Sequence, residues 1–386
     1  MQTDFASRII AGAGLAAFLA LSAAGNAQAA QTDAPEAETT KVKVETVAEG
    51  LENPWGLQFL PDGRYLVTER PGRLRVVGKD GKLSKPIAGV PKVWARQQGG
   101  LLDVRLSQNF AEDGVIFLSF SEPRDGGKAA TAVASARLKL DDGGGSLEDV
   151  KVIFRQQPAF DRGIHFGSRI LYDKTGALFI TTGDRGQFDP AQDPEVTVGK
   201  VIRIKPDGSI PDDNPKVDGW KPEIWSIGHR NIQGAALDPA TGKLWTAEHG
   251  ARGGDELNQP EKGKNYGWPV ISYGRHYSGE KIGEGQKKEG LEQPVYYWDP
   301  SIAVSGLAIY SGDLFPDWKG NFLVGGLAGA YLERLVMKDG EVVAREKLLD
   351  GEGLRIRDVR EGPDGAVYVL VDEDDGALLR LIPGKG

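Results

Sequence analysis

The sequence predicts an all-β fold, a six-bladed β-propeller of four-stranded antiparallel blades. Three observations support this prediction: a unit of two short apolar strands joined by a turn recurs six times, turn formers are abundant (53 glycines and 22 prolines), and amphipathic helical patterns of useful length are absent beyond the N-terminal segment. Repeated small sheets that close into a ring leave few exposed strand edges. A propeller is therefore the architecture that this pattern favours.

The N-terminal segment, residues 1–30, is expected to be a cleaved secretory signal peptide. Arg8 precedes an apolar run, and Ala27-Gln28-Ala29 supplies a small-x-small cleavage pattern. The run is shorter than the about 20 residues that a membrane span needs. We therefore expect export to the periplasm and, because no second apolar span follows, no membrane span in the mature chain. Residues 31–40 are polar and are expected to form a disordered lead-in.

The remaining residues, 41–386, are expected to form a single propeller domain. In each repeat, a turn built on Asp and Gly or on Pro and Gly separates the two apolar strands. Six copies allow about 57 residues each, enough for four short strands and their loops. Two unrelated β-sandwich domains, the alternative, do not account for six similar turns along the whole chain. The copies occupy residues 56–69, 102–120, 169–182, 234–247, 306–324 and 359–370.

Loops from every blade of a propeller meet at one end of the central channel. Asp184 follows the second strand of the third repeat, and the segment 248–256 follows that of the fourth. We therefore expect both to open on the same face. Residues far apart in the sequence can then form one pocket.

Charge and cysteine content exclude some functions. The formal net charge is -8, which argues against nucleic acid as a partner, because its binding needs clustered Lys and Arg. A sugar or another small neutral substrate fits better. The chain has no cysteine, so stability after export depends on core burial and bound metal rather than disulfides.

The segment 228–269 carries the most informative chemistry. Arg230 stands beside amide side chains, and a Gly-rich loop with carboxylates, including Glu256, follows. Arginine offers a planar fork of donors for carboxylates, and Ca²⁺ prefers oxygen ligands such as Glu256. The segment therefore fits a site for an anionic cofactor beside a hard cation, with a plain polar loop as the alternative.

These motifs together resemble the soluble quinoprotein sugar dehydrogenases that use pyrroloquinoline quinone (PQQ), specifically the compact aldose sugar dehydrogenases. The similarity runs from Asn53-Pro54-Trp55-Gly56 to Arg355-Ile356-Arg357-Asp358, with motifs on at least five repeats. The fold of that family is a six-bladed propeller, in agreement with the repeat count. The resemblance implies oxidation of an aldose at C1 to the lactone, with PQQ and Ca²⁺ as cofactors and an external electron acceptor.

The resemblance also implies roles for individual residues. His165 matches the catalytic base, which would take the proton of the C1 hydroxyl, and Asp184 matches the acid that orients it. Structural roles, a hydrogen-bonded histidine and a turn aspartate, are the alternatives. The implied Ca²⁺ ligands are the carbonyls of Gly250 and Ala251, the Glu256 carboxylate and the carbonyl of Tyr266. The implied cofactor contacts are Gln98, Arg230, Asn231, Tyr277, Gly326, Leu327, Ala328, Arg355, Ile356 and Arg357.

The chain departs from the pattern of this family at two positions. Ala328 stands where many relatives have a lysine that reaches the cofactor, so one positive charge is lost unless Arg334 or another cation compensates. Ile232 stands where relatives often have proline. Two other functions stay open: a non-catalytic propeller that binds a glycan or a protein, and a Ca²⁺-dependent lactonase. Arg230, Arg355 and Arg357 favour the dehydrogenase, because neutral ligands need no cationic cradle.

Overall fold

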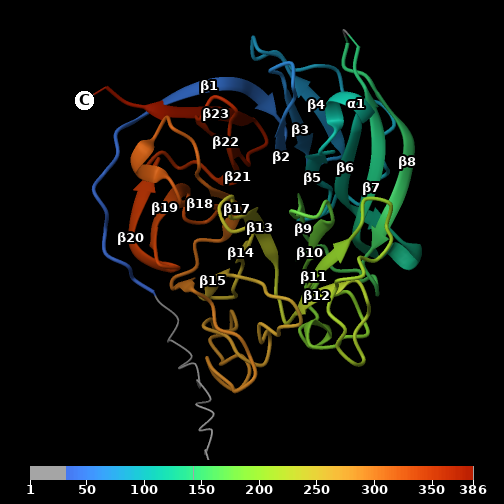
Figure 1. The fold of residues 1–386 in the computed structure, drawn as a ribbon, viewed down its shortest axis with the longest axis vertical. Coiled ribbons are helices and arrows are strands. Elements are labelled where there is room, and N and C mark those ends of the chain that lie inside the picture. The colour runs from blue at the N-terminus through green and yellow to red at the C-terminus, as the bar shows by residue number, and fades with distance from the viewer. Residues whose placement is uncertain (1–31, 142, 386) are drawn as a thin grey trace, which may run out of the picture.

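Six antiparallel sheets surround a central axis in the computed structural model, which describes residues 32–141 and 143–385 (Figure 1). Consecutive strands pair within each sheet, and the first strand of each predicted repeat lies nearest the axis. The six-bladed β-propeller is therefore confirmed. The predicted signal peptide, residues 1–30, lies outside the described residues. No helix in the described part of the chain has the length and apolar character needed to cross a bilayer.

The first three blades follow the first three repeats. A one-turn helix, α1 (Phe110–Asp113), forms the turn of the second repeat. The strands are β2 (Pro54–Phe59), β3 (Tyr65–Glu69) and β4 (Arg73–Val77); β5 (Leu101–Leu106), β6 (Val115–Pro123), β7 (Ala129–Lys139) and β8 (Ser146–Arg155); and β9 (Gly167–Tyr172), β10 (Leu178–Thr182), β11 (Lys200–Ile204) and β12 (Ile224–Ile227).

The last three blades follow the other repeats, and the sixth takes its outer strand from the N-terminal end. The strands are β13 (Ile232–Leu237), β14 (Leu244–Glu248), β15 (Asp255–Asn258) and β16 (Tyr296–Trp298); β17 (Val304–Ile309), β18 (Phe322–Gly326), β19 (Tyr331–Lys338) and β20 (Glu341–Leu348); and β21 (Ile356–Glu361), β22 (Val367–Val371), β23 (Gly376–Pro383) and β1 (Val42–Leu51).

One blade differs from the prediction of four strands. The sheet β2–β3–β4 has three, and beyond β4 only a single bridge, between Val77 and Leu83, continues it. The residues after Leu83 run as irregular chain to β5. This connection includes Gly89, Pro91 and Gly99, and glycine and proline are both depleted in strands.

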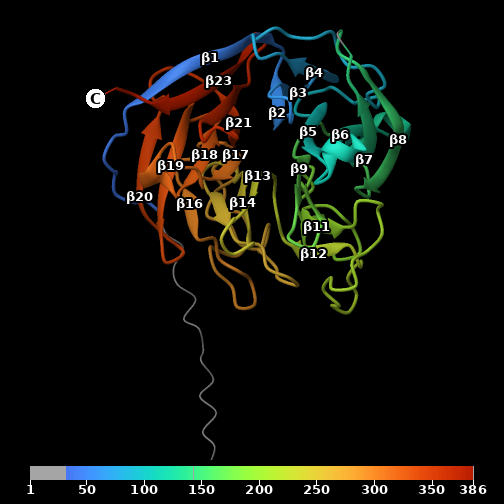
Figure 2. The same ribbon diagram turned by 45° about the horizontal axis from the view of Figure 1, so that its top comes forward.

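Strand β1 closes the ring. It pairs antiparallel with β23, from Val42 opposite Pro383 to Leu51 opposite Gly376, and Figure 2 shows the two strands side by side. The segment before β1, expected as a disordered lead-in, lies against β20 instead. Ala37 N donates to the carbonyl of Arg345 at 2.7 Å, and Ala34 is only 5% exposed. Pairing with a strand edge thus orders a segment whose composition is polar.

The hydrophobic core is divided among the interfaces between blades. The six largest clusters of buried residues each join two neighbouring sheets, and the inner strands contact one another in a closed circle from β2 through β21 and back to β2. The interface that closes the ring contains Leu51 from β1, Leu57 and Val67 from the first blade, and Leu370 from the last. Burial of these side chains therefore holds the N-terminal strand to both terminal blades.

Polar groups fill the axis. The guanidinium of Arg169, on β9, lies 3.3 Å from Asp103 on β5 and 3.1 Å from Asp358 on β21. Its Nε donates to the carbonyl of Gln233 at 2.5 Å, and its guanidinium carbon is 4.2 Å from the ring centre of Trp55. Arg169 is 1% exposed. One side chain of the third blade therefore contacts four other blades at the centre of the ring.

We expect Leu51→Ala to destabilise the fold by about 2–5 kcal/mol, because it leaves a cavity in the closing interface. The matched control on the same strand, Val44→Ala, removes a side chain that is 40% exposed and should change stability by about 0.5 kcal/mol or less. Urea unfolding of both variants measures the difference. Equal destabilisation of the two variants would contradict the role of Leu51 in holding β1 in the closed ring.

Candidate functional site

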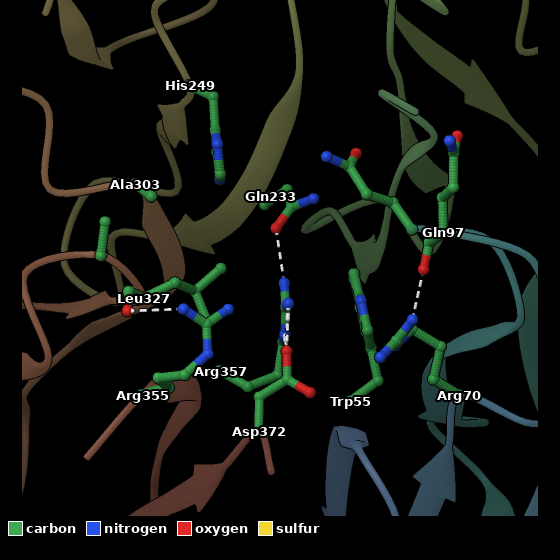
Figure 3. Close-up of a pocket in the computed structure, with 12 residues that line it drawn as sticks. Trp55, Arg70, Gln97, Gln233, His249, Ala303, Leu327, Arg355, Arg357 and Asp372 are labelled. Carbon is green, nitrogen blue, oxygen red and sulfur yellow. Dashed lines mark hydrogen bonds and ion pairs between the residues drawn. The ribbon is translucent and has the colours of Figure 1, made fainter. Parts of the chain in front are cut away.

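A cavity of about 310 Å³ opens at one mouth of the axial channel (Figure 3). Its walls come from the starts of inner strands and from the residues that follow the second strand of several blades. Arg70 follows β3, His249 follows β14, Ala328 follows β18 and Asp372 follows β22. The loops that follow the second strands of four blades therefore share one face, and they include the start of the segment 248–256. The cavity is lined by Trp55, Arg70, Gln97, Gln98, Gln233, His249, Ala303, Leu327, Ala328, Arg355, Arg357 and Asp372.

Positive charge predominates in this cavity, although the chain as a whole is acidic. Three arginines line it against one carboxylate, Asp372. Arg357 donates from Nε to Asp372 at 3.0 Å and from another guanidinium nitrogen to Gln233 at 2.6 Å. Arg355 donates to the carbonyl of Leu327 at 3.1 Å, and Arg70 donates to the carbonyl of Gln97. Figure 3 shows these side chains around the hollow.

A histidine–aspartate pair lies beside the cavity. His165 Nδ1 is 2.6 Å from Asp184 Oδ1, and the Asp184 side chain is fully buried. Because Asp184 has a depressed pKa and accepts hydrogen bonds, the pairing assigns the proton of neutral His165 to Nδ1. Nε2 then carries a lone pair, and no described residue hydrogen-bonds to it. The side chain is 12% exposed, so this nitrogen is the accessible one.

The backbone at His165 is held in an unusual conformation. Its φ is 54°, a left-handed value that costs energy in a residue with a β-carbon. Gln98 Oε1 accepts the His165 amide at 2.8 Å, which ties the histidine to the cavity wall. Arg185 Nε donates to the carbonyl of Ile164 at 2.8 Å, and a second nitrogen donates to that of Arg162. These contacts offset the strain.

The electrostatics of the pair suit a proton acceptor. Burial, together with the charge of Arg230, lowers the pKa of His165 below its usual value, while Asp184 opposes that shift. Burial alone would raise the pKa of Asp184. The hydrogen bond and charge of His165, together with the charge of Arg230, outweigh burial and lower it. Near neutral pH the pair is therefore a neutral imidazole on a carboxylate.

Three buried side-chain nitrogens lack a hydrogen-bond partner in the described structure. Arg230 Nε, Asn231 Nδ2 and His249 Nε2 have no hydrogen-bond partner among the described residues. Burial and the charge of Arg230 hold the pKa of His249 well below its usual value, so it is a neutral donor or acceptor. Buried donors are almost always satisfied in folded proteins. A flat, anionic ligand with several oxygens fits these donors and the cavity arginines.

The predicted metal ligands fall into two neighbouring places. Gly250 and Ala251 follow β14 directly after His249, and Gly250 N donates to Asp255 at 2.8 Å. The amide nitrogen of Asn258 donates to the carboxylate of Glu256 at 3.0 Å and to that of Glu248 at 2.8 Å. Within residues 32–141 and 143–385, no three His, Cys, Asp or Glu side chains cluster as metal ligands. A cation there would therefore need backbone oxygens.

The surroundings of Glu256 nonetheless fit a cation. Burial and the neighbouring Glu248 raise the pKa of Glu256 to about 8. Asn258 Oδ1 is buried and has no partner in the described structure. Carboxylate, amide and carbonyl oxygens are the ligands that Ca²⁺ takes. The donor set at this place is therefore suited to Ca²⁺ rather than to zinc.

Comparison with known proteins identifies the family. The sequence model described as "Glucose / Sorbosone dehydrogenase" matches residues 51–380. The chain belongs to this family. The resemblance inferred from the motifs is confirmed, and the protein is an oxidoreductase.

Individual relatives agree with this assignment. Aldose sugar dehydrogenase YliI of Escherichia coli (strain K12) is 47% identical over 347 residues, covering 89% of this chain and 93% of the relative. A crystal structure of a glucose dehydrogenase is 49% identical with a TM-score of 0.86, covering 89% of this chain and 100% of the other. The PQQ-bound form of the aldose sugar dehydrogenase of Streptomyces coelicolor is 29% identical with a TM-score of 0.74, over 89% and 100%.

The cavity is lined by five of the ten predicted cofactor contacts: Gln98, Leu327, Ala328, Arg355 and Arg357. Gly326 ends β18, immediately before Leu327 and Ala328 of the cavity wall. Ile356 stands between Arg355 and Arg357 in the sequence and is fully buried. Tyr277 is 77% exposed and does not line the cavity. It lies next to His276, whose ring is 5.6 Å from that of Phe188.

Several cavity residues were not singled out from the sequence. Asp372 belongs to an acidic run that suggests a solvated turn, but it is 6% exposed and pairs with Arg357. Aligning the repeats would have found Asp372, because it follows a second strand as Asp184 does. The sequence indicated Trp55 only as part of the motif Asn53-Pro54-Trp55-Gly56. Gln233 carried no signal of its own.

We expect Asp184→Asn to lower the pKa of His165 further. The carboxylate stabilises the imidazolium, and its removal leaves burial and Arg230 unopposed. An NMR titration of the His165 ring, assigned by its absence in His165→Ala, measures the shift. An unchanged or higher pKa would contradict the coupling of the two side chains.

Proposed function

We propose that the chain oxidises aldose sugars at C1 to the lactone, with PQQ and Ca²⁺ as cofactors, and passes the electrons to an external acceptor. One observation carries the proposal: an arginine-rich cavity in an acidic chain lies beside a buried His–Asp pair. Family membership and the PQQ-bound relative support it. The predicted signal peptide supports a periplasmic location.

His165 is the general base of this proposal. Asp184 holds Nδ1, so Nε2 accepts the proton of the C1 hydroxyl. The C1 hydrogen leaves with its electron pair, and the C1–O bond becomes the carbonyl of the lactone. Because the pKa of His165 lies below its usual value, the imidazole is free to accept a proton at neutral pH.

The cavity residues bind and orient the cofactor in this proposal. PQQ, when bound, supplies the acceptor for the hydride. Arg230, Arg355 and Arg357 would hold its carboxylate and quinone oxygens, and Asn231 offers an unpaired amide. Ala328 adds no charge to the wall, but Arg70 and Arg355 flank the cavity and supply cations there.

Calcium would occupy two places in this proposal. The carbonyls of Gly250 and Ala251 would hold the ion next to the cofactor, where a divalent cation supplies Lewis acidity. Glu256 and the carbonyl of Tyr266 would hold a structural ion, beside the unpaired oxygen of Asn258. The second ion stabilises the β14–β15 region by neutralising the paired carboxylates.

Purified mature chain with added PQQ and Ca²⁺ should reduce an artificial electron acceptor when glucose, galactose, xylose or maltose is supplied. His165→Ala should still bind PQQ but lose turnover by about 10²-fold or more, because the proton acceptor is gone. Steady-state rates and cofactor absorbance separate the two effects. No cofactor-dependent turnover with any sugar would instead favour a propeller that binds glycans or hydrolyses lactones.

Calcium should raise the melting temperature of the cofactor-free chain, because a ligand that binds only the folded state stabilises it by about 4 kcal/mol at 1,000 times its Kd. Glu256→Gln should lose most of this gain. Exposed Glu289, changed to Gln, is the matched control and should keep it. Thermal unfolding scans with Ca²⁺ or with a chelator measure the rise in melting temperature of each variant. The same gain in both variants would remove Glu256 from the ligand set.

A further inference from the structure

The two carboxylate oxygens of Asp184 have different partners. Oδ1 accepts from His165 Nδ1 at 2.6 Å and from the amide of Gly186 at 2.7 Å. Oδ2 accepts from the indole Nε1 of Trp268 at 2.8 Å, and from no other described residue. The side chain is fully buried, so water does not replace this donor. Trp268 therefore supplies the second fixed point of the carboxylate.

A second fixed point determines orientation. A carboxylate tied through one oxygen can rotate about the Cβ–Cγ bond, which swings Oδ1 away from its donor. A donor on each oxygen fixes the plane of the group. In a buried site, an unmade hydrogen bond costs about 1–3 kcal/mol, so the arrangement with both bonds is strongly preferred. The direction of the His165 ring thus depends on Trp268, a residue of the segment 228–269.

Trp268 is itself held rigidly. Its ring stacks on Phe188, with ring centres 5.3 Å apart, and only 6% of the residue is exposed. Its backbone N donates to the carbonyl of Gly228 at 2.9 Å, and its own carbonyl accepts from Gln192 Nε2 at 2.7 Å. The indole is therefore a fixed reference rather than a mobile side chain.

The loop that carries Phe188 and Gln192 is anchored in turn. Lys200, fully buried on β11, donates from Nζ to the carbonyls of Pro190, Ala191 and Val198 at 2.8, 2.9 and 2.6 Å. Three acceptors match the three donors of an ammonium group. The third blade therefore fixes the 188–192 loop.

The indole also contacts the cofactor side of the site. The guanidinium carbon of Arg230 lies 5.2 Å from the ring centre of Trp268, within cation–π range. The carbonyl of Arg230 accepts the amide of Asp184 at 2.8 Å. One indole thus touches both the acid of the His–Asp pair and an arginine predicted to hold the cofactor.

We propose that Trp268 is a positioning residue, which fixes the carboxylate of Asp184 and through it aims His165 at the cavity. The part of this proposal that concerns catalysis rests on the proposed dehydrogenase activity. The orienting of Asp184 and His165 by Trp268 does not rest on that activity, because the hydrogen bonds among these three residues need no cofactor or substrate. The reacting histidine would then be aligned by groups of the third and fourth blades.

Trp268→Phe tests the proposal, because it keeps the ring against Phe188 and Arg230 but removes the indole N–H. Trp298→Phe is the matched control. Trp298 Nε1 also donates to a buried carboxylate, that of Glu333, in the hydrophobic cluster between the fourth and fifth blades. Both variants lose a buried indole–carboxylate bond, so both should be less stable. Only Trp268→Phe should change His165.

The first readout is the low-field proton NMR signal of His165 Nδ1–H in the chain without added cofactor. In Trp268→Phe we expect this signal to move upfield or to vanish by exchange with water, and in Trp298→Phe to stay unchanged. The second readout is the rate. With PQQ and Ca²⁺, kcat of Trp268→Phe should fall about 10-fold or more, with the KM for sugar within about twofold, because the base is misaimed.

A folded Trp268→Phe protein with the wild-type signal, or with the wild-type kcat, overturns the proposal. If the wild-type chain oxidises no sugar, the proposed function fails, and the signal alone decides the positioning role. If Trp268→Phe does not fold, Phe188→Leu takes its place, because it loosens the indole but keeps its N–H. The same two readouts apply, and unchanged values there also overturn the proposal.

Discussion

The contacts of Arg169 at the axis are the constraint on which the site depends. The inner strands of a propeller meet around a channel that is too narrow for a hydrophobic core. In this chain a buried arginine fills it and binds Asp103 and Asp358 from other blades. Removing one partner of such a network would leave a charge without compensation, which is strongly unfavourable. The network therefore fixes the inner strands relative to one another and lies against Trp55, which lines the cavity.

Side chains from distant parts of the sequence are held in place at and beside the cavity. Trp55 stacks over Arg169, Arg357 pairs with Asp372 and Gln233, and Gln98 holds the backbone of His165. None of these contacts joins neighbouring residues of the sequence. The result is a rigid, positively charged hollow beside a proton acceptor.

The parts of the fold that follow local rules could be predicted from the sequence. Turn residues and alternating apolar strands are local signals, so the repeats and the six blades were correct. The lead-in and the first blade were not, because their outcome depends on which strand edge is available. The family motifs predicted Arg355 and Arg357 correctly as neighbours in one cavity. Trp268 could not be assigned, because its role depends on a hydrogen bond to Asp184 of another blade that no spacing in the sequence reveals.

Completion of the last sheet by β1 has a consequence for biosynthesis. Strand β1, which is made before the other strands, has no strand partner until β23, the last of them, is made. A nascent chain still on the ribosome can form only an open arc, whose terminal faces expose apolar side chains such as Leu57 and Leu370. Such faces favour aggregation. A chain of this design therefore gains its native compactness only after release, which is compatible with transport across a membrane in an unfolded form.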